Sequence, residues 1–304
     1  MHKSNTMPTP AKSYTQLTVR EETTLLPFLL QAMNGISRTK AKELLTQQRV
    51  SVDDVLSSRF DTPLRPGQVV RIMRRGTKTP LRSRFVKIVY EDAYLMVVDK
   101  SEGIRTNTLP GEPHDSLKRI LDDYVKRTNP RMAVHTVHRL DRATSGLLLF
   151  AKRRDVQQQF IDHWREMVTD RRYVALVEGR MERERGTVQS YLLENKMFVS
   201  YSTPNPEGGG QLAITHYHTL ERGEHCSLVD LKLETGRKNQ IRVHMHDLGH
   251  PVCGDRKYEA ATDPCGRVCL HAWKLDFIHP VTHRPMSFTT PVPKEFVREM
   301  KNEE

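Results

Sequence analysis

The sequence lacks long hydrophobic runs. Among its 304 residues the longest apolar stretches, such as residues 147–151, are far shorter than the ~20 residues that a bilayer span needs. The polar residues 1–15 also lack the apolar core of a secretory signal. We therefore expect a cytoplasmic protein with no membrane partner.

Cysteine is scarce as well. The four cysteines at positions 226, 253, 265 and 269 do not form the dense framework of a small secreted domain, so reduced thiols are predicted. Cys265, Cys269 and His271 suggest a zinc site, but no second close pair of Cys or His completes four ligands. We expect no bound metal.

Negative charge is in deficit. The chain has 48 Lys+Arg against 37 Asp+Glu, which gives a net charge of +11. Residues 1–85 hold 15 Lys+Arg and 6 Asp+Glu, a net of +9, whereas residues 86–304 hold 33 and 31, a net of +2. Such an excess favours polyanionic partners, although a basic face that serves solubility has the same composition.

The basic N-terminal region has the pattern of a helix followed by a hairpin. In residues 36–45, Ile36, Ala41, Leu44 and Leu45 fall on one helical stripe, and Ser37 is placed to cap the helix. Residues 49–55 and 64–71 alternate like strands around turns.

This order resembles the small αL RNA-binding module of a ribosomal small-subunit protein and of many RNA-modifying enzymes. The matching residues are Ser37, Arg38, Ala41 and Lys42, then Leu64, Gly67 and Val70. Arg38, Lys40 and Lys42 are the expected phosphate contacts of the module.

A second region begins near residue 85 and contains more strand patterns than helix patterns. Short apolar alternations occur at residues 88–90, 95–98, 146–151, 173–177 and 228–233, and a helix is predicted over residues 155–168. Strands and helices do not alternate regularly. We therefore predict an α+β fold with a mixed, largely antiparallel sheet, preceded by the small helix-plus-hairpin domain.

The most informative segment runs from Val137 to Ala151, where a charged loop leads into an apolar strand. Taken alone, Asp141 in this loop is more simply a turn cap or a surface ion-pair partner. However, His138-Arg-Leu-Asp141 followed by Thr-Ser-Gly-Leu-Leu-Leu-Phe-Ala151 resembles the catalytic motif of RluA-type pseudouridine synthases. Residues 172–179, 234–245 and 249–255 also match in order and spacing, so the resemblance covers nearly all of residues 85–304.

The resemblance implies an isomerase that detaches uracil from its sugar, turns it over and rejoins it through carbon, with no cofactor. Asp141 is the implied catalytic carboxylate, acting on either the anomeric carbon or a sugar proton. Tyr173 matches a tyrosine that packs on the extruded base, although alone it reads as a core residue. Arg242 matches the arginine that pairs with the catalytic Asp, rather than a phosphate contact.

Further residues are implied to contact RNA around this site: Arg139, Arg142, Arg237, Lys238, Gln240 and Ile241. Two positions depart from the family pattern. Asn239 replaces the usual His before Gln-Ile-Arg, and the usual Lys-Pro-x-Gly is here Lys100-Ser-Glu-Gly103. The predicted organisation is a flexible tail (1–15), an αL-type RNA-binding domain (16–75), a linker (76–84) and the catalytic domain (85–304).

Other interpretations remain open at this stage. His135, His138 and Asp141, with His244 and His246 downstream, have the spacing of a metal-dependent hydrolase site. The basic N-terminal module alone would also suffice for a noncatalytic ribosome-assembly factor. The expected partner is RNA, with large-subunit ribosomal RNA favoured over transfer RNA, and no obligate protein partner is evident.

Overall fold

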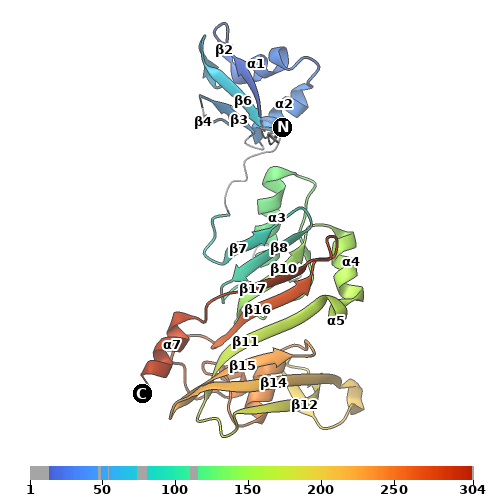
Figure 1. Ribbon diagram of the computed structural model, residues 1–304, viewed down its shortest axis with the longest axis vertical. Coiled ribbons are helices and arrows are strands. Elements are labelled where there is room, and N and C mark those ends of the chain that lie inside the picture. Colours follow the sequence, from blue (N-terminus) through green and yellow to red (C-terminus); the bar gives the residue numbers. More distant parts are fainter. Residues whose placement is uncertain (1–13, 47–48, 54, 74–80, 110–115, 303–304) are drawn as a thin grey trace, which may run out of the picture. The chain divides into compact units, whose positions relative to one another are not determined.

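A computed structural model describes residues 14–46, 49–53, 55–73, 81–109 and 116–302. The chain divides into two compact units, one made of residues up to 80 with residues 123–132, the other of residues 81–122 and 133–304 (Figure 1). Most of the expected tail and of the expected linker lies outside the described residues. Strand β1 begins at Tyr14, just inside the range expected for the tail. The domain boundaries stay a prediction.

The first unit is a small four-stranded antiparallel sheet with two helices and a separate two-stranded ladder. The sheet order is β1-β6-β3-β4, and β2 pairs with β5. Its elements are β1 (Tyr14–Thr18), β2 (Thr23–Thr24), α1 (Leu25–Ala32), α2 (Arg38–Thr46), β3 (Val50–Val52), β4 (Val55–Leu56), β5 (Pro63–Leu64) and β6 (Val69–Met73).

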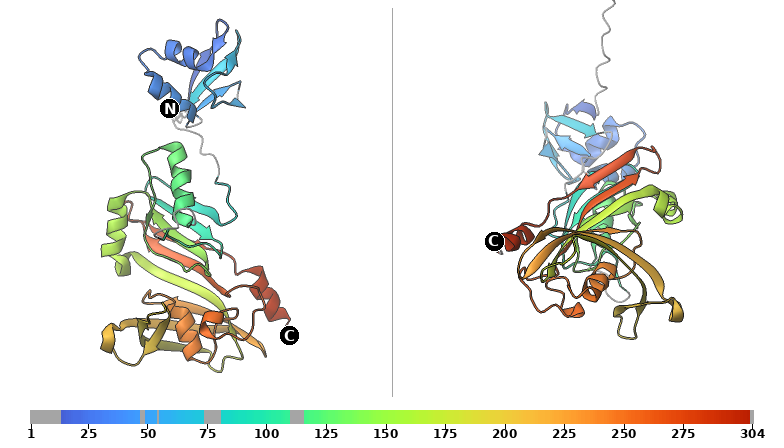
Figure 2. Two further views of the ribbon diagram at one scale, coloured as in Figure 1. Left: turned by 180° about the vertical axis from the view of Figure 1, so that it is seen from behind. Right: turned by 60° about the horizontal axis from the view of Figure 1, so that its bottom comes forward.

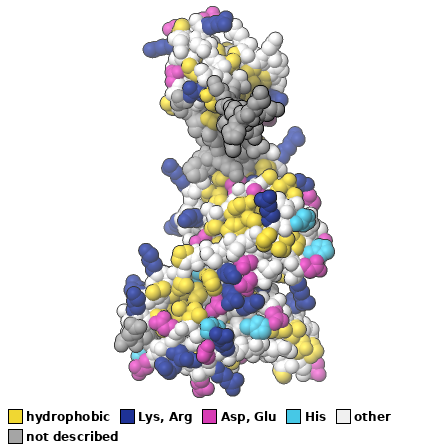
Figure 3. Space-filling view, viewed as in Figure 1, with side chains coloured by type: hydrophobic (Ala, Val, Ile, Leu, Met, Phe, Trp, Pro, Cys, Tyr) yellow, Lys and Arg dark blue, Asp and Glu magenta, His cyan; other side chains and the backbone are white. Residues whose placement is uncertain are grey.

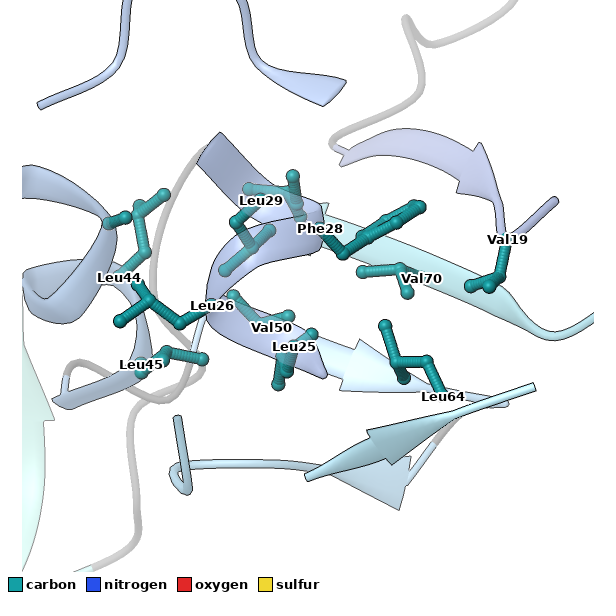
Figure 4. Packing of buried hydrophobic residues seen from close by; sticks show 12 residues of the cluster. Val19, Leu25, Leu26, Phe28, Leu29, Leu44, Leu45, Val50, Leu64 and Val70 are labelled. Carbon is teal, nitrogen blue, oxygen red and sulfur yellow. The ribbon is translucent and has the colours of Figure 1, made fainter. Parts of the chain in front are cut away.

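Helix α2 turns one face to the core of this unit. Ala41, Leu44 and Leu45 are buried against α1 and the sheet, as Figure 4 shows for the two leucines. The hydroxyl of Ser37 accepts a hydrogen bond from the backbone N–H of Lys40 at 3.2 Å, which caps the first turn as expected. The helix therefore keeps its cationic side chains on the outside.

The second unit is built on one large sheet, whose strands run side by side in Figures 1 and 2. The order along it is β13-β12-β14-β15-β11-β16-β10-β8-β7, with β17 beside β16 and β9 beside β10. Only the β10–β16 pair is parallel among the described strands of this sheet. The strands are β7 (Val86–Glu91), β8 (Leu95–Lys100), β9 (His135–Thr136), β10 (Ser145–Ala151), β11 (Val168–Glu178), β12 (Arg185–Glu194), β13 (Ser200–Thr203), β14 (Gln211–Arg222), β15 (Cys226–Leu233), β16 (Leu270–Ile278) and β17 (Pro285–Thr289).

Helices cover parts of this sheet. Val156 and Phe160 of α4 pack against β8, β10 and β16, and Val243 of α6 packs against β12 and β14. The helices are α3 (Leu117–Thr128), which crosses the boundary between the units, α4 (Arg154–Asp162), α5 (Trp164–Met167), α6 (Gln240–Asp247) and α7 (Lys294–Lys301). Short 3-10 helices lie at Glu207–Gly209 and Arg256–Tyr258.

The helix predicted over residues 155–168 is two helices. It breaks at His163, whose backbone angles (φ −120°, ψ 29°) are not helical, and Val168 already belongs to strand β11. Val156 and Phe160 are buried, whereas Trp164 and Met167 are only partly buried. The four apolar residues therefore do not all pack on the sheet as one side of a single helix.

The predicted α+β class with a largely antiparallel sheet is confirmed. Figure 3 shows that Lys and Arg on one face of the second unit are interspersed with Asp and Glu, as its small net charge requires. Among the helices of the described residues, none has the length and apolar content that a bilayer span needs.

Candidate active site

A pocket opens over the middle of the large sheet. It has a volume of about 100 Å³ and is bordered by the loop before β10, by the loop between β15 and α6, and by strand β11. Asp141, Tyr173 and Arg242, which the sequence assigned to one site, all line this pocket. Four adjacent strands, β15, β11, β16 and β10, therefore carry the segments that surround it.

The loop that carries Asp141 is held by the last residue of β8 and by the segment after this strand. The buried Lys100 ammonium donates hydrogen bonds to the backbone carbonyls of Thr144 at 2.7 Å and Ser101 at 2.9 Å. The hydroxyl of Thr106 donates to the Leu140 carbonyl at 2.8 Å and accepts from the Leu140 N–H at 3.1 Å. Both sides of Asp141 are thus fixed, although residues 100–103 depart from the family pattern.

Burial lowers the pKa of Lys100 to about 8, although the nearby Glu102 and Asp141 favour its charged form. Lys100 is 1% exposed, and the described hydrogen bonds of its ammonium go to backbone carbonyls. Lys100 therefore acts on the Asp141 loop through the backbone.

Strand β10 enters the sheet directly behind this loop. A Cβ at Gly146 would lie 2.2 Å from the carbonyl oxygen of Ala272, so only glycine allows the parallel pairing with β16 there. Next to it, the Ser145 hydroxyl lies 2.7 Å from His271 Nδ1 and accepts a hydrogen bond from Arg267 at 2.6 Å. The end of the Asp141 loop is therefore closely packed.

Arg242 has two carboxylate neighbours, and the closer one is Asp255. Its guanidinium donates two hydrogen bonds of 2.5 Å to Asp255, which is 1% exposed, whereas Nη1 lies 3.9 Å from Asp141 Oδ2. Burial tends to lower the pKa of Arg242, but Asp255 and then Asp141 more than offset this and raise it. The guanidinium is thus anchored by Asp255 and reaches Asp141 only at ion-pair distance.

Asn239 contributes to the same arrangement. Its side-chain carbonyl accepts a hydrogen bond of 3.0 Å from Arg242 Nη1, and its backbone is left-handed, with φ 57° and ψ 16°. Asparagine tolerates this conformation better than most residues. The departure from the family's histidine therefore places a neutral acceptor beside the arginine, at the start of α6.

Gln240 and Ile241 are buried, with exposed fractions of 2% and 4%. The Gln240 amide donates to the Ile214 carbonyl and the Thr215 hydroxyl, and its oxygen accepts from Thr235 and from the Arg237 N–H. These bonds tie the loop after β15 to β14. Direct RNA contact by these two residues stays a prediction.

Tyr173 forms part of the pocket wall and is 5% exposed. Burial raises the pKa of its phenol, with a further increase from Asp141 that the nearby Arg171 opposes. Arg171 is itself nearly buried and donates a hydrogen bond of 3.0 Å to the Thr235 carbonyl. The phenol therefore stays protonated near neutral pH, in a pocket that it shares with the Asp141 carboxylate and the Arg171 guanidinium.

The predicted phosphate contacts are more exposed. Arg139, Arg142 and Lys238 are exposed and Arg237 is half-buried. Arg142 donates to the Gly103 carbonyl, Arg237 donates to the Leu212 carbonyl, and Lys238 pairs with Glu194 at 2.7 Å. On the first unit, Arg38, Lys40 and Lys42 are exposed along α2, and the Lys42 ammonium lies 5.7 Å from the centroid of the Phe60 ring.

His138 lies in a different position from the one a metal site would require. Its Nε2 accepts a hydrogen bond from the Leu149 N–H at 3.1 Å, and burial lowers its pKa to about 3. Across the described part of the chain, no group of three or more His, Cys, Asp or Glu side chains is placed to hold a metal ion.

Sequence reasoning missed Asp255, Lys100 and Arg171 as parts of the site. Asp255 lies in a segment that matched the family, but nothing in that segment identifies Arg242 as its partner. Lys100 attracted attention only because its surroundings depart from the family pattern. Arg171 precedes a matched segment and becomes visible only when β11 is placed beside the loop at Thr235.

Comparisons with known proteins identify the family to which the chain is similar. The family model described as RNA pseudouridylate synthase matches residues 94–247. The uncharacterized RNA pseudouridine synthase YjbO of Bacillus subtilis is 37% identical over 71% of this chain and 76% of its own length. The ribosomal large subunit pseudouridine synthase D of Nitrosomonas europaea is 29% identical over 88% of this chain and 80% of its own length.

A solved structure is also similar. Human RNA pseudouridylate synthase domain containing 1 superposes with a TM-score of 0.56 at 27% sequence identity. The match covers 68% of this chain and 84% of the human chain.

Proposed function

The chain belongs to the RNA pseudouridylate synthase family, of the RluA type, and from this we propose that it isomerises uridines in large-subunit ribosomal RNA with Asp141 as the catalytic carboxylate. It is an isomerase that acts on RNA. The observation that carries the residue assignment is the meeting of Asp141, Tyr173 and Arg242 at one pocket.

The reaction moves the bond between base and sugar. The bond from the anomeric carbon to uracil N1 breaks, the base turns over in the pocket, and a bond to C5 forms. N1 gains a proton and C5 loses one, so atoms balance without an oxidant or a cofactor. Asp141 attacks the anomeric carbon or takes a sugar proton, and a carboxylate serves in either role.

Arg242 lies beside Asp141 without occupying its oxygens. At 3.9 Å the guanidinium is too far from Asp141 for a hydrogen bond and reaches it only at ion-pair distance. Because Asp255 and Asn239 already fix the guanidinium, the oxygens of Asp141 stay available to the substrate. Tyr173 supplies an apolar face and a protonated hydroxyl at the extruded base.

Ribosomal RNA is the proposed substrate for two reasons. The match to the ribosomal large subunit enzyme covers 88% of this chain, so it extends beyond the region that the family model matches. Residues 1–85 carry a net charge of +9, which suits an accessory domain that grips a large structured RNA. We propose that this domain is the αL-type module. Transfer RNA is the alternative substrate.

The test uses cells that lack the gene and express wild type, Asp141→Asn or Asp162→Asn. Asp162 is an exposed carboxylate on α4, so its variant controls for the substitution itself. We expect wild type and Asp162→Asn to restore at least one pseudouridine in large-subunit ribosomal RNA, and Asp141→Asn to restore none. Restoration by Asp141→Asn would refute the residue assignment, and restoration only in transfer RNA would refute the substrate.

A further inference from the structure

Two more hollows continue from the catalytic pocket along the second unit. The inner one, of about 340 Å³, shares Arg139, Arg171, Gly236 and Arg237 with the catalytic pocket. The outer one, of about 380 Å³, shares Trp164, Arg165 and Arg171 with the inner one. Neighbouring hollows share these lining residues, and we call the three hollows together the groove.

Trp164 lines both the inner and the outer hollow. It begins α5, next to β11 (Figure 1), and remains only partly buried. The guanidinium carbon of Arg171 lies 5.4 Å from the centroid of its ring, and the His138 ring lies at the same centroid distance, tilted by 52°. Arg171 is in turn fixed to the Thr235 carbonyl, so the indole rests on a rigid support. A large aromatic side chain held in an open groove is a natural stacking surface.

The groove is also cationic. Arg139 and Arg165 are exposed at its wall, and Arg237 keeps part of its guanidinium available because only Nε bonds to the Leu212 carbonyl in the described residues. Besides Asp141, two carboxylates line the groove. Asp170 pairs with Arg172 and Lys274, and Glu234 is hydrogen-bonded to His216. Four arginines of the groove, Arg139, Arg165, Arg171 and Arg237, outnumber the three carboxylates, so the net charge favours a phosphodiester chain.

We propose that this groove binds the nucleotide next to the target uridine, with its base against Trp164 and its phosphates near Arg139, Arg165 and Arg237. The inference rests on the proposed RNA-directed activity, since an extruded uridine at Asp141 draws its neighbour's backbone to the rim where the groove starts. Trp164 is then a substrate-binding residue that selects unpaired RNA, because a paired base cannot stack on a side chain.

The test measures binding of a short RNA that contains the target uridine in its unmodified form. The protein carries Asp141→Asn in every case, so that no turnover occurs. The RNA is made intact or with an abasic nucleotide on the 5′ or the 3′ side of the uridine. Stacking of one base on an aromatic side chain corresponds to roughly 5- to 150-fold in affinity. We expect Trp164→Ala to weaken binding of intact RNA about tenfold or more, and to leave binding of one of the abasic RNAs unchanged.

Two further variants separate stacking from support of the fold. Trp164→Phe should restore binding to within about threefold of the parent, and Trp164→Leu, which replaces Trp164→Ala if that variant does not fold, should not. Leu220→Ala is the matched control, because Leu220 is 50% exposed at the end of β14 away from Leu212. Equal weakening of intact and both abasic RNAs by Trp164→Ala would overturn the proposal. Failure of the wild-type enzyme to form pseudouridine in the intact RNA would instead overturn the proposed function.

Discussion

The two units use their cationic side chains in different ways. In the first unit, Arg38, Lys40 and Lys42 are exposed on α2, and no carboxylate of the described residues pairs with them. In the second unit, Arg242 and Arg172 are bound to buried or half-buried carboxylates. The same residue types therefore supply an open positive surface in one unit and internal supports in the other.

This difference explains why net charge alone describes the molecule poorly. The second unit has more than twice as many Lys and Arg as the first 85 residues, yet its own carboxylates neutralise nearly all of them. A cation that is paired inside the protein contributes to the geometry of the site, whereas an exposed one contributes to long-range attraction of RNA. Substitutions in the two units should therefore have effects of different kinds.

The largest expected effect of a single substitution is at Asp255. Replacement by Asn would leave the buried Arg242 charge without its two-bond partner, which typically costs about 3–5 kcal/mol. We expect the free energy of unfolding of the second unit to fall by roughly that amount, together with the loss of most activity. Both tryptophans, Trp164 and Trp273, belong to this unit, so urea unfolding followed by tryptophan fluorescence measures it selectively.

The matching control is Asp61→Asn in the first unit. Asp61 pairs with Arg59 at 2.9 Å, but both side chains are exposed. Surface pairs contribute little to stability, so no measurable change is expected in hydrogen exchange of the first unit. Comparable destabilisation by both variants would remove the distinction drawn between the units.

Acidification should also separate the units. Burial lowers the pKa of His138 to about 3, and of His244 and His271 to about 4. Between the ordinary value of about 6.5 and these values, the unfolded chain binds more protons than the folded one, so stability falls as pH falls. From pH 7 to pH 5 each of the three histidines contributes a loss of about 2 kcal/mol, so the second unit should lose on the order of 5 kcal/mol, measured by tryptophan fluorescence in urea.

Residues 3–85 contain no histidine, so the first unit lacks this source of acid sensitivity. Hydrogen exchange at pH 7 and pH 5, corrected for the intrinsic rates, should show protection lost mainly in the second unit. Equal loss in both units would indicate that carboxylates, rather than the three histidines, control the response.

The smallest expected effect on the folded protein is at α2 of the first unit. Replacing Arg38, Lys40 and Lys42 together by Ala should weaken RNA binding roughly tenfold and reduce the salt dependence of log K by about 2–3, because each phosphate contact contributes about 0.7–0.9. The free energy of unfolding and the rate constant for pseudouridine formation in the enzyme–RNA complex should not change. The control replaces Lys294, Arg298 and Lys301 on α7, and an equal loss of salt dependence there would contradict the special role of α2.

Much of the fold could be predicted from the sequence because its signals are local. Alternating apolar residues indicated the strands, and Ser37 with the stripe at Ala41, Leu44 and Leu45 indicated α2. The break at His163 could not be predicted, since it depends on how α4 packs against β8, β10 and β16. Periodicity alone continued the helix to residue 168.

Only those residues of the candidate site that lie in sequence motifs could be predicted. Asp141, Tyr173 and Arg242 were found because each lies in a segment with a family pattern, and their catalytic roles remain predictions. Asp255 as the main partner of Arg242, and Lys100 as the support of the Asp141 loop, depend on side chains that meet only in the folded chain. A pattern within one segment of the sequence does not predict contacts between residues of different segments.

The parallel pairing of β10 with β16 has a consequence for synthesis of the chain. Ser145 and Gly146 lie opposite His271 and Ala272, about 126 positions later, so a growing chain that has not yet reached β16 cannot complete the wall behind the Asp141 loop. The strands of the first unit's sheet all lie within residues 14–73, so they can pair once that segment has left the ribosome. With the RNA-binding role proposed for the first unit, a nascent chain would be able to hold RNA well before it could modify it.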